Sequence, residues 1–412
     1  MSSTAQPAVT PDASQDRFPS DFGTYWEKSE TRAVRRAGRV FRALFRFDLL
    51  PAAENVEKLA LGYYDGDQLA DAFVDAVHAA PSTVDAWRMF DQAIEHGIDT
   101  VPDAPAPLAR LLDELEREPD WVDHDLVELG AKTFRRYGPT VFSLAGATTL
   151  LGYTESSVAK PLALTGAYIG ESARTRHMET ARFWIDISEP GALRHGGRGR
   201  ASAIRVRAMH AAVRRRVTGH REWDVAAWGV PISQSEALLT LIAGSLAPGL
   251  GLRLMGYRTS IAEIEAMMHF WRYIGHLMGV RPRWYPADVK EAIQLSAAFA
   301  LKRSFSSGAD GVELIESYPA AFRPKAGTTL RRRLRDEVNY RAQLGYTRYF
   351  LPGSFYRRYD MPNPWPWALH PLLQAPLIFA VETLRRRSAT VERLQDRYAS
   401  WRRESWWRNE TR

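Results

Sequence analysis

The sequence contains no cysteine among its 412 residues. This absence excludes structural disulfides, thiolate-bound haem, iron–sulfur clusters and zinc sites built on cysteine. No glycine-rich stretch stands in the strand–loop–helix context that holds phosphate groups. None of the ten histidines follows a glutamate by three residues. The Glu-x-x-His pairs typical of di-iron helical bundles are therefore missing as well.

Long apolar runs are also absent. No uncharged apolar run reaches the length of a bilayer span. The first 20 residues are polar and lack the apolar core of a secretory signal, so we expect a cytoplasmic protein. The net charge is +7, with 45% hydrophobic and 25% charged residues. This composition is ordinary for a globular chain, and the mild basic excess predicts no nucleic-acid partner.

Helical periodicity runs through nearly the whole chain, without sustained period-two alternation. We predict an all-α protein with a disordered tail over residues 1–25 and a single large multi-helical domain over residues 26–412. The capping patterns that begin at Ser233 and Ser260 mark two helix starts. The other expected helices are 31–47, 52–62, 67–79, 83–96, 104–117, 123–137, 140–153, 160–172, 286–300, 329–345, 368–387 and 388–412.

Residues 173–217 carry the densest group of chemically able side chains, on two predicted helices joined by a Gly/Pro-rich loop. The first helix carries Arg176 and Thr180, which share one face because they are four residues apart. The second carries His210. At about 100° per residue, its imidazole points with the apolar side of the helix. The neighbours on that side are Ala203, Val206, Val213 and Val217.

Two arginines, Arg207 and Arg214, flank His210 on the predicted helix. An imidazole on an apolar wall beside cations suits an anionic cofactor whose metal needs an axial nitrogen. Haem has this character, because its iron accepts histidine and its propionates pair with arginine. The same pattern is also met in a structural core histidine next to a solvated arginine face. The residues alone leave both interpretations open.

The strings RVRAMHAAVRRRV and ARTRHMETARF resemble the latex-clearing-protein (rubber oxygenase) family, which also includes oxygenases of mycophenolic acid biosynthesis. The resemblance continues in YYDGDQLADAFVDAV, WGVPISQSEALLTLIAGSL and FWRYIGHLMGV. The resemblance implies a helical fold with a globin-like core and extra helices, which together enclose haem b. It also implies an enzyme that cleaves isoprenoid C=C bonds with O2. His210 would then bind the iron, and Arg176 and Thr180 would lie on the opposite, O2-binding side.

Two positions depart from the family pattern. Glu179 stands where latex-clearing proteins have lysine, and Lys160 stands where an acidic residue is expected. Glu179 is a candidate base for proton abstraction from an allylic carbon. Because rubber-cleaving enzymes must be exported, the departures and the missing signal favour a different hydrophobic, isoprenoid-like substrate.

Three alternatives follow from these patterns. The first is the haem-dependent oxygenase that uses O2. The second is a haem protein of the same fold with a hydroxylase, peroxidase-like or sensing role. The third is a non-enzymatic protein whose basic helices, 31–47, 329–345 and 385–408, contact a membrane surface. A separate polar stripe on the helix predicted over 261–278 consists of Glu265, His269, Arg272 and His276. We expect this stripe to be either the lining of a pocket or an interface.

Overall fold

A computed structural model describes residues 17–166, 171–324 and 329–411. Within these ranges the secondary structure is helical, with no β-strand, as predicted. The α-helices are α1 (Gly23–Ser29), α2 (Arg32–Phe45), α3 (Ala53–Leu61), α4 (Gln68–Ala79), α5 (Thr83–His96), α6 (Ala106–Glu116), α7 (His124–Arg136), α8 (Thr140–Gly152), α9 (Ser156–Thr165), α10 (Glu171–Ser188), α11 (Arg198–Thr218), α12 (Val225–Trp228), α13 (Gln234–Gly251), α14 (Ile261–Leu277), α15 (Val289–Lys302), α16 (Gly308–Ala321), α17 (Leu330–Phe350), α18 (Gly353–Arg358), α19 (His370–Arg385) and α20 (Ala389–Thr411). Short 3-10 helices are η1 (Ser20–Phe22), η2 (Gly62–Tyr64), η3 (Ile98–Thr100), η4 (Leu252–Met255) and η5 (Trp367–Leu369).

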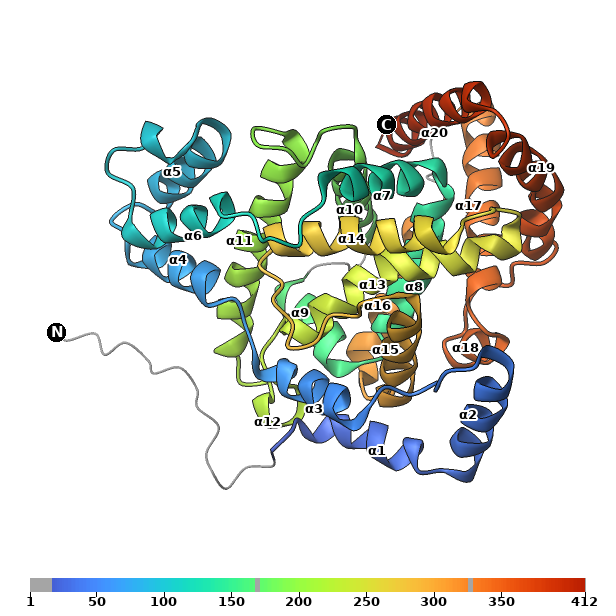
Figure 1. Ribbon diagram of the computed structural model, residues 1–412, viewed down its shortest axis with the longest axis horizontal. Helices are drawn as coiled ribbons and strands as arrows, with labels where there is room; N and C mark the ends of the chain where they lie inside the picture. Colours follow the sequence, from blue (N-terminus) through green and yellow to red (C-terminus); the bar gives the residue numbers. More distant parts are fainter. Residues whose placement is uncertain (1–16, 167–170, 325–328, 412) are drawn as a thin grey trace.

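Helix α14 crosses the middle of the molecule and packs against α7 and α13 (Figure 1). Its approach to α7 depends on Gly130, where a Cβ atom would collide with the carbonyl oxygen of Ala266. Trp271 of α14 lies beside Phe134 and Trp184, with ring centroids 5.5 Å apart in each pair. These aromatic contacts join α7, α10 and α14 around one core.

The predicted helix starts are confirmed where their caps form. Ser260 and Glu263 make a complete capping box at the start of α14. At the start of α13 the Ser233 hydroxyl accepts a hydrogen bond from the N–H of Glu236. Helix α13 and η4 together (Gln234–Met255) are long and apolar enough to cross a membrane. Its packing against α14 and α15, with 56% of the apolar window buried, identifies it as a core helix.

The folded domain begins earlier than residue 26. Phe22 and Tyr25 are buried in the main core, and Phe22 packs against Tyr63 at a centroid distance of 5.9 Å. The predicted tail boundary at residue 25 is therefore wrong, because its last aromatic side chains are anchored. Residues 1–16 of the predicted tail lie outside the described residues. Helix α16 was not predicted, since its sequence contains Gly311 and Pro319.

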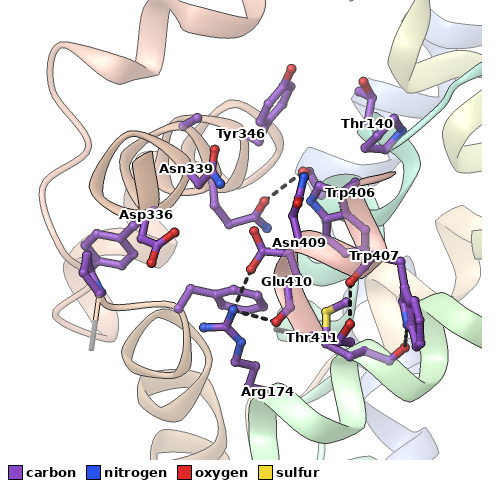
Figure 2. Close-up of a pocket in the computed structure, with 18 of the residues that line it drawn as sticks. Thr140, Arg174, Asp336, Asn339, Tyr346, Trp406, Trp407, Asn409, Glu410 and Thr411 are labelled. Atoms are coloured by element: carbon purple, nitrogen blue, oxygen red, sulfur yellow. Dashed lines mark hydrogen bonds and ion pairs between the residues drawn. The ribbon is translucent and has the colours of Figure 1, made fainter. Parts of the chain in front are cut away.

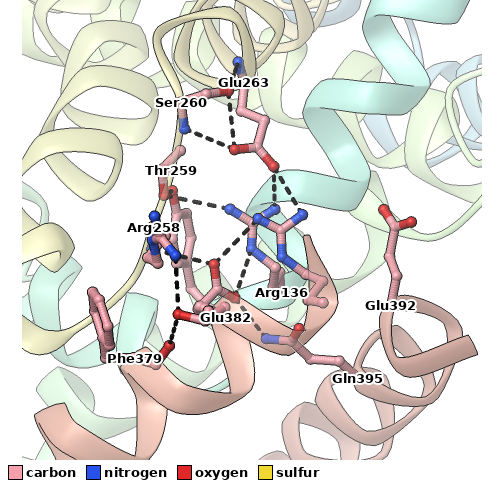
Figure 3. Close-up of polar contacts among 12 residues, drawn as sticks. Arg136, Arg258, Thr259, Ser260, Glu263, Phe379, Glu382, Glu392 and Gln395 are labelled. Atoms are coloured by element: carbon pink, nitrogen blue, oxygen red, sulfur yellow. Dashed lines mark hydrogen bonds and ion pairs between the residues drawn. The ribbon is translucent and has the colours of Figure 1, made fainter. Parts of the chain in front are cut away.

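A buried charge cluster fastens α19 to α7 and α14 (Figure 3). Arg136 of α7 contacts Glu263 at 2.8 Å and Glu382 of α19 at 3.2 Å. Arg385 contacts the same two carboxylates, each at 3.2 Å. Gln395 of α20 donates to Glu382 at 2.7 Å. One side of α19 is thereby fixed to the body of the protein.

Candidate functional site

Helix α11 has an unusual buried side, because arginines occupy its centre. Arg200, Arg207 and Arg214 are seven residues apart and all three are buried. Arg200 donates to the Leu115 carbonyl at 2.7 Å and to the Tyr273 hydroxyl at 3.2 Å. Guanidinium groups, together with the expected apolar residues, therefore join α11 to its neighbours.

Arg207 and Arg214 both have protein partners. Arg207 is 2% exposed and makes a two-pronged pair with Asp67, at 2.6 and 2.9 Å. Its remaining terminal nitrogen donates to Glu114 at 2.6 Å. Arg214 pairs with Asp71 and donates to two backbone carbonyls, each at 3.1 Å. A haem propionate would therefore have to share the guanidinium groups of Arg207 and Arg214 with these protein partners. The contact with propionates stays a prediction.

His210 lies at the edge of this arginine seam, half-buried beside the buried Ala203 and Val217. Among the described residues, neither of its ring nitrogens has a hydrogen-bond partner. Burial, reinforced by the charge of Arg214, lowers its pKa to about 4. The imidazole is therefore neutral at pH 7. A neutral ring with an uncommitted nitrogen fits the requirement of a haem iron for an axial ligand.

The predicted opposite-side residues lie on α10. Arg176 and Glu179 are exposed and form an ion pair at 2.9 Å. The Thr180 hydroxyl donates to the Arg176 carbonyl at 3.0 Å. Lys160 on α9 does not pair with Glu179. It contacts Glu222 at 2.9 Å and Asp310 at 2.7 Å.

Helices α10 and α11 pack against each other and are joined by the short loop after Ser188. Arg176 is twelve residues from the end of α10, and His210 is twelve residues from the start of α11. At about 1.5 Å per residue, both lie roughly 18 Å from the connection. An antiparallel pair therefore brings them to the same level along the two axes.

A cavity of about 850 Å³ borders α10 on another face (Figure 2). Its walls come from α8, α10, α17, α19 and α20. Arg174 binds the Glu410 carboxylate at 2.8 Å, and Trp407 donates to the Met178 carbonyl at 3.2 Å. Burial raises the pKa of Glu410, although Arg174 opposes this effect. Glu179 also lines the cavity, so this predicted catalytic residue faces a solvent-accessible space.

Two histidines that were not predicted as ligands, His177 and His269, pack in structural settings. The buried His276 of α14 resembles His210, because burial lowers its pKa to about 4 and its Nε2 has no hydrogen-bond partner among the described residues. His177 is buried against the edges of Tyr318, Phe322 and Trp406, and burial lowers its pKa to about 4. His269 of α14 accepts from the backbone N–H of Asp123 at 3.0 Å.

The polar stripe of α14 is an interface with the segment before α7. Arg272 lies 4.1 Å from the centroid of the Trp121 ring, and His276 meets the same ring at its edge. Of the two interpretations given for the stripe, the interface holds, and the cavity lies elsewhere.

The cavity could not be predicted from the sequence, because its walls come from helices far apart in the chain. On α10, Arg174 lies one turn before Met178 and Glu179, and all three line the cavity. This shared helix face is a local signal that the sequence offers for the cavity. The partner of Arg174, Glu410, lies 236 residues later. No spacing rule connects two such residues.

Residues 134–381 match the family described as the ER-bound oxygenase mpaB/B'/rubber oxygenase, catalytic domain. The match covers more than half of the chain, and the chain belongs to this family. It includes α10 and α11, and with them the candidate site residues. The family is one of oxygenases, as the resemblance predicted.

The rubber oxygenase of Streptomyces sp. (strain K30) is 27% identical over 230 residues. The alignment spans 54% of this chain and 54% of that protein, so it reaches about half of the relative's length. A latex clearing protein in the closed state has the same fold. It shows a TM-score of 0.61 and 22% identity, and it covers 82% of this chain and 91% of its own.

Proposed function

We propose that the protein is a haem b-dependent oxygenase that cleaves a C=C bond of a hydrophobic, isoprenoid-like substrate with O2. One observation carries the proposal. The imidazole of His210 is neutral, half-buried and without a hydrogen-bond partner among the described residues, within the family's catalytic domain. Such a side chain has the properties of an iron ligand. Haem bound there would supply the binding and activation of O2.

The reaction balances without a further reductant. One C=C bond and one O2 molecule give two C=O groups, and both oxygen atoms enter the products. The four electrons that O2 accepts come from the two alkene carbons. A site for this reaction needs no separate electron donor.

The protein side chains on α10 would control charge and protons. The Arg176 guanidinium brings a fixed positive charge that stabilises negative charge developing on oxygen. Glu179 orients it through their 2.9 Å ion pair. The Glu179 carboxylate, which also lines the cavity, can accept a proton from an allylic carbon. Thr180 holds the helix backbone at this level and offers a hydroxyl oxygen as a further acceptor.

The test of haem binding is an absorption spectrum of the purified protein, as isolated and after dithionite and CO. We expect a Soret band that is lost in His210→Ala. His195→Ala is the matched control, because His195 is exposed and its ring lies 3.4 Å from the Glu116 carboxylate on the protein surface. A Soret band that survives His210→Ala unchanged would refute His210 as the ligand.

The test of the reaction uses a synthetic cis-1,4-isoprene oligomer and 18O2. We expect label in both carbonyl products, with the rate lowered at least tenfold in Glu179→Gln. Label in only one of the two carbonyl products would refute the insertion of both oxygen atoms of O2. A hydroxylated oligomer with intact C=C bonds would instead assign the protein to the hydroxylase alternative.

A further inference from the structure

Helix α2 has an apolar side that the described protein does not cover. None of its residues from Arg32 to Phe45 is buried. Leu44 and Phe45 are 71% and 58% exposed. Its aromatic contacts are local, since Phe41 packs on Phe45 and on Phe47 at centroid distances of 4.6 and 5.1 Å. The helix therefore lies on the body of the protein without contributing to its core.

The sequence of α2 divides it into two faces. At about 100° per residue, its larger apolar residues, Val34, Val40, Phe41, Leu44 and Phe45, occupy an arc of roughly 140°. The opposite arc carries the five arginines of the helix together with Ala43, and no acidic residue occurs between Arg32 and Phe45. Arg36 and Arg39 have no ion-pair partner among the described residues. This pattern is typical of helices that lie in the plane of a membrane interface.

Helix α19 presents a second exposed apolar stripe. Leu373 and Leu377 are 76% and 70% exposed, and Leu372 and Leu384 extend the stripe. The two charged residues of α19 near it, Glu382 and Arg385, are turned inward to the buried cluster. The exposed Arg386 and Arg387 follow directly after the helix. Apolar surface bordered by arginine is thus repeated on a second element.

Both helices lie at the same end of the molecule along its longest axis (Figure 1). Helix α2 lies outside residues 134–381, so this surface is partly built from chain beyond the family's catalytic domain. We propose that the exposed faces of α2 and α19 form a docking surface for an anionic lipid bilayer. The proposal does not depend on haem or on the oxygenase reaction.

Charge decides in favour of a bilayer over a second copy of the chain. Packing α2 against an identical α2 through their apolar arcs would place the flanking arginines of the two copies, Arg36 and Arg42, beside one another with no acidic residue on α2 to pair with them, and like charges repel. An anionic bilayer complements the arginines and takes up the adjoining apolar arc at the same time. The net charge of +7 adds long-range attraction to such a surface.

The experiment measures co-sedimentation of the full-length protein with phosphatidylcholine vesicles, with and without phosphatidylglycerol. We expect binding to the anionic vesicles that weakens with salt. Arg36→Gln with Arg39→Gln should weaken it about twenty-five-fold, at about fivefold for each arginine. Leu44→Glu with Phe45→Glu should weaken it at least tenfold, and Leu373→Glu with Leu377→Glu should do the same.

Matched controls test whether position matters. Val84→Glu with Leu126→Glu places two charges on exposed apolar positions of α5 and α7. Arg110→Gln with Arg194→Gln removes two exposed arginines elsewhere. Both should bind as the wild type does, and circular dichroism should show that every variant is folded.

Three outcomes would overturn the proposal. These are no vesicle binding by the wild type, equal binding to both vesicle types, and equal losses in the α2 variants and the controls. A dimer in size-exclusion chromatography that the Leu44/Phe45 change dissociates, without vesicle binding, would assign the surface to a second copy.

Discussion

Replacing Arg207 by methionine tests whether the arginine seam of α11 is structural. Methionine keeps much of the side-chain volume but leaves Asp67, which is 8% exposed, and Glu114 without their positive partner. Breaking a buried pair on one side costs about 3–5 kcal/mol. Because whole proteins are stable by only about 5–15 kcal/mol, this is a large fraction of the free energy of unfolding.

The assay is urea unfolding followed by circular dichroism, on protein prepared without and with haem. We expect Arg207→Met to lower the free energy of unfolding by the stated amount without haem. Arg216→Met is the matched control on the same helix. Arg216 is exposed and has no ion pair among the described residues, so we expect a change within about 0.5 kcal/mol.

A second substitution separates the pair from simple packing. Adding Asp67→Asn to Arg207→Met removes the stranded carboxylate and should restore about 1–3 kcal/mol. If Arg207→Met instead leaves the haem-free protein stable and weakens only haem binding, Arg207 serves the propionates and the structural assignment is refuted.

Three further changes have defined expectations. Gly279 has a φ of +75° and lies against the Asp67–Arg207 pair, so Gly279→Ala should lower the free energy of unfolding by more than about 1 kcal/mol in the same urea assay. Ser260→Ala removes the capping box of α14 and should cost about 1 kcal/mol, measured against Ser296→Ala, a serine in the interior of α15. The folded-state pKa of His177 is lowered to about 4 from 6.5, so its contribution is complete above pH 6.5 and is lost as the pH falls toward 4. His177→Phe should therefore weaken the loss of stability on acidification by about 2 kcal/mol at pH 5, and an unchanged pH profile would contradict the low pKa.

Local patterns predicted most helices because amphipathic period and capping residues act within a few residues of chain. The capping box at Ser260 is an example, because both of its hydrogen bonds form. Helix α16 was missed because Gly311 and Pro319 interrupt its pattern, although both are accommodated by tertiary packing. The tail boundary was placed too late because two aromatic anchors are hidden in a polar, Pro/Ser-rich segment.

The partners of charged residues could not be predicted in the same way. The position of Arg207 on the inner side of α11 follows from helix geometry, but Asp67 lies 140 residues earlier in the sequence. From the sequence alone, an arginine on a predicted helix gives no indication of whether its side chain contacts solvent, a carboxylate or a cofactor. The cavity beside α10 could not be predicted either, because residues of α20, at the far end of the sequence, form one of its walls.

The guanidinium groups of Arg200, Arg207 and Arg214, spaced seven residues apart on α11, also affect how rigidly the imidazole of His210 is oriented. Two helices that meet only through apolar side chains can shift or rotate slightly against each other at a small cost in free energy. On α11, a shift by one residue would turn each guanidinium by about 100° away from its carboxylate, so only one register is permitted. The direction of the His210 ring is thus set by Asp67, Asp71 and Glu114, on or next to α4 and α6. Under the proposed function, inherited changes at those carboxylates would alter the reaction from a distance, without any change in the side chains that contact the substrate.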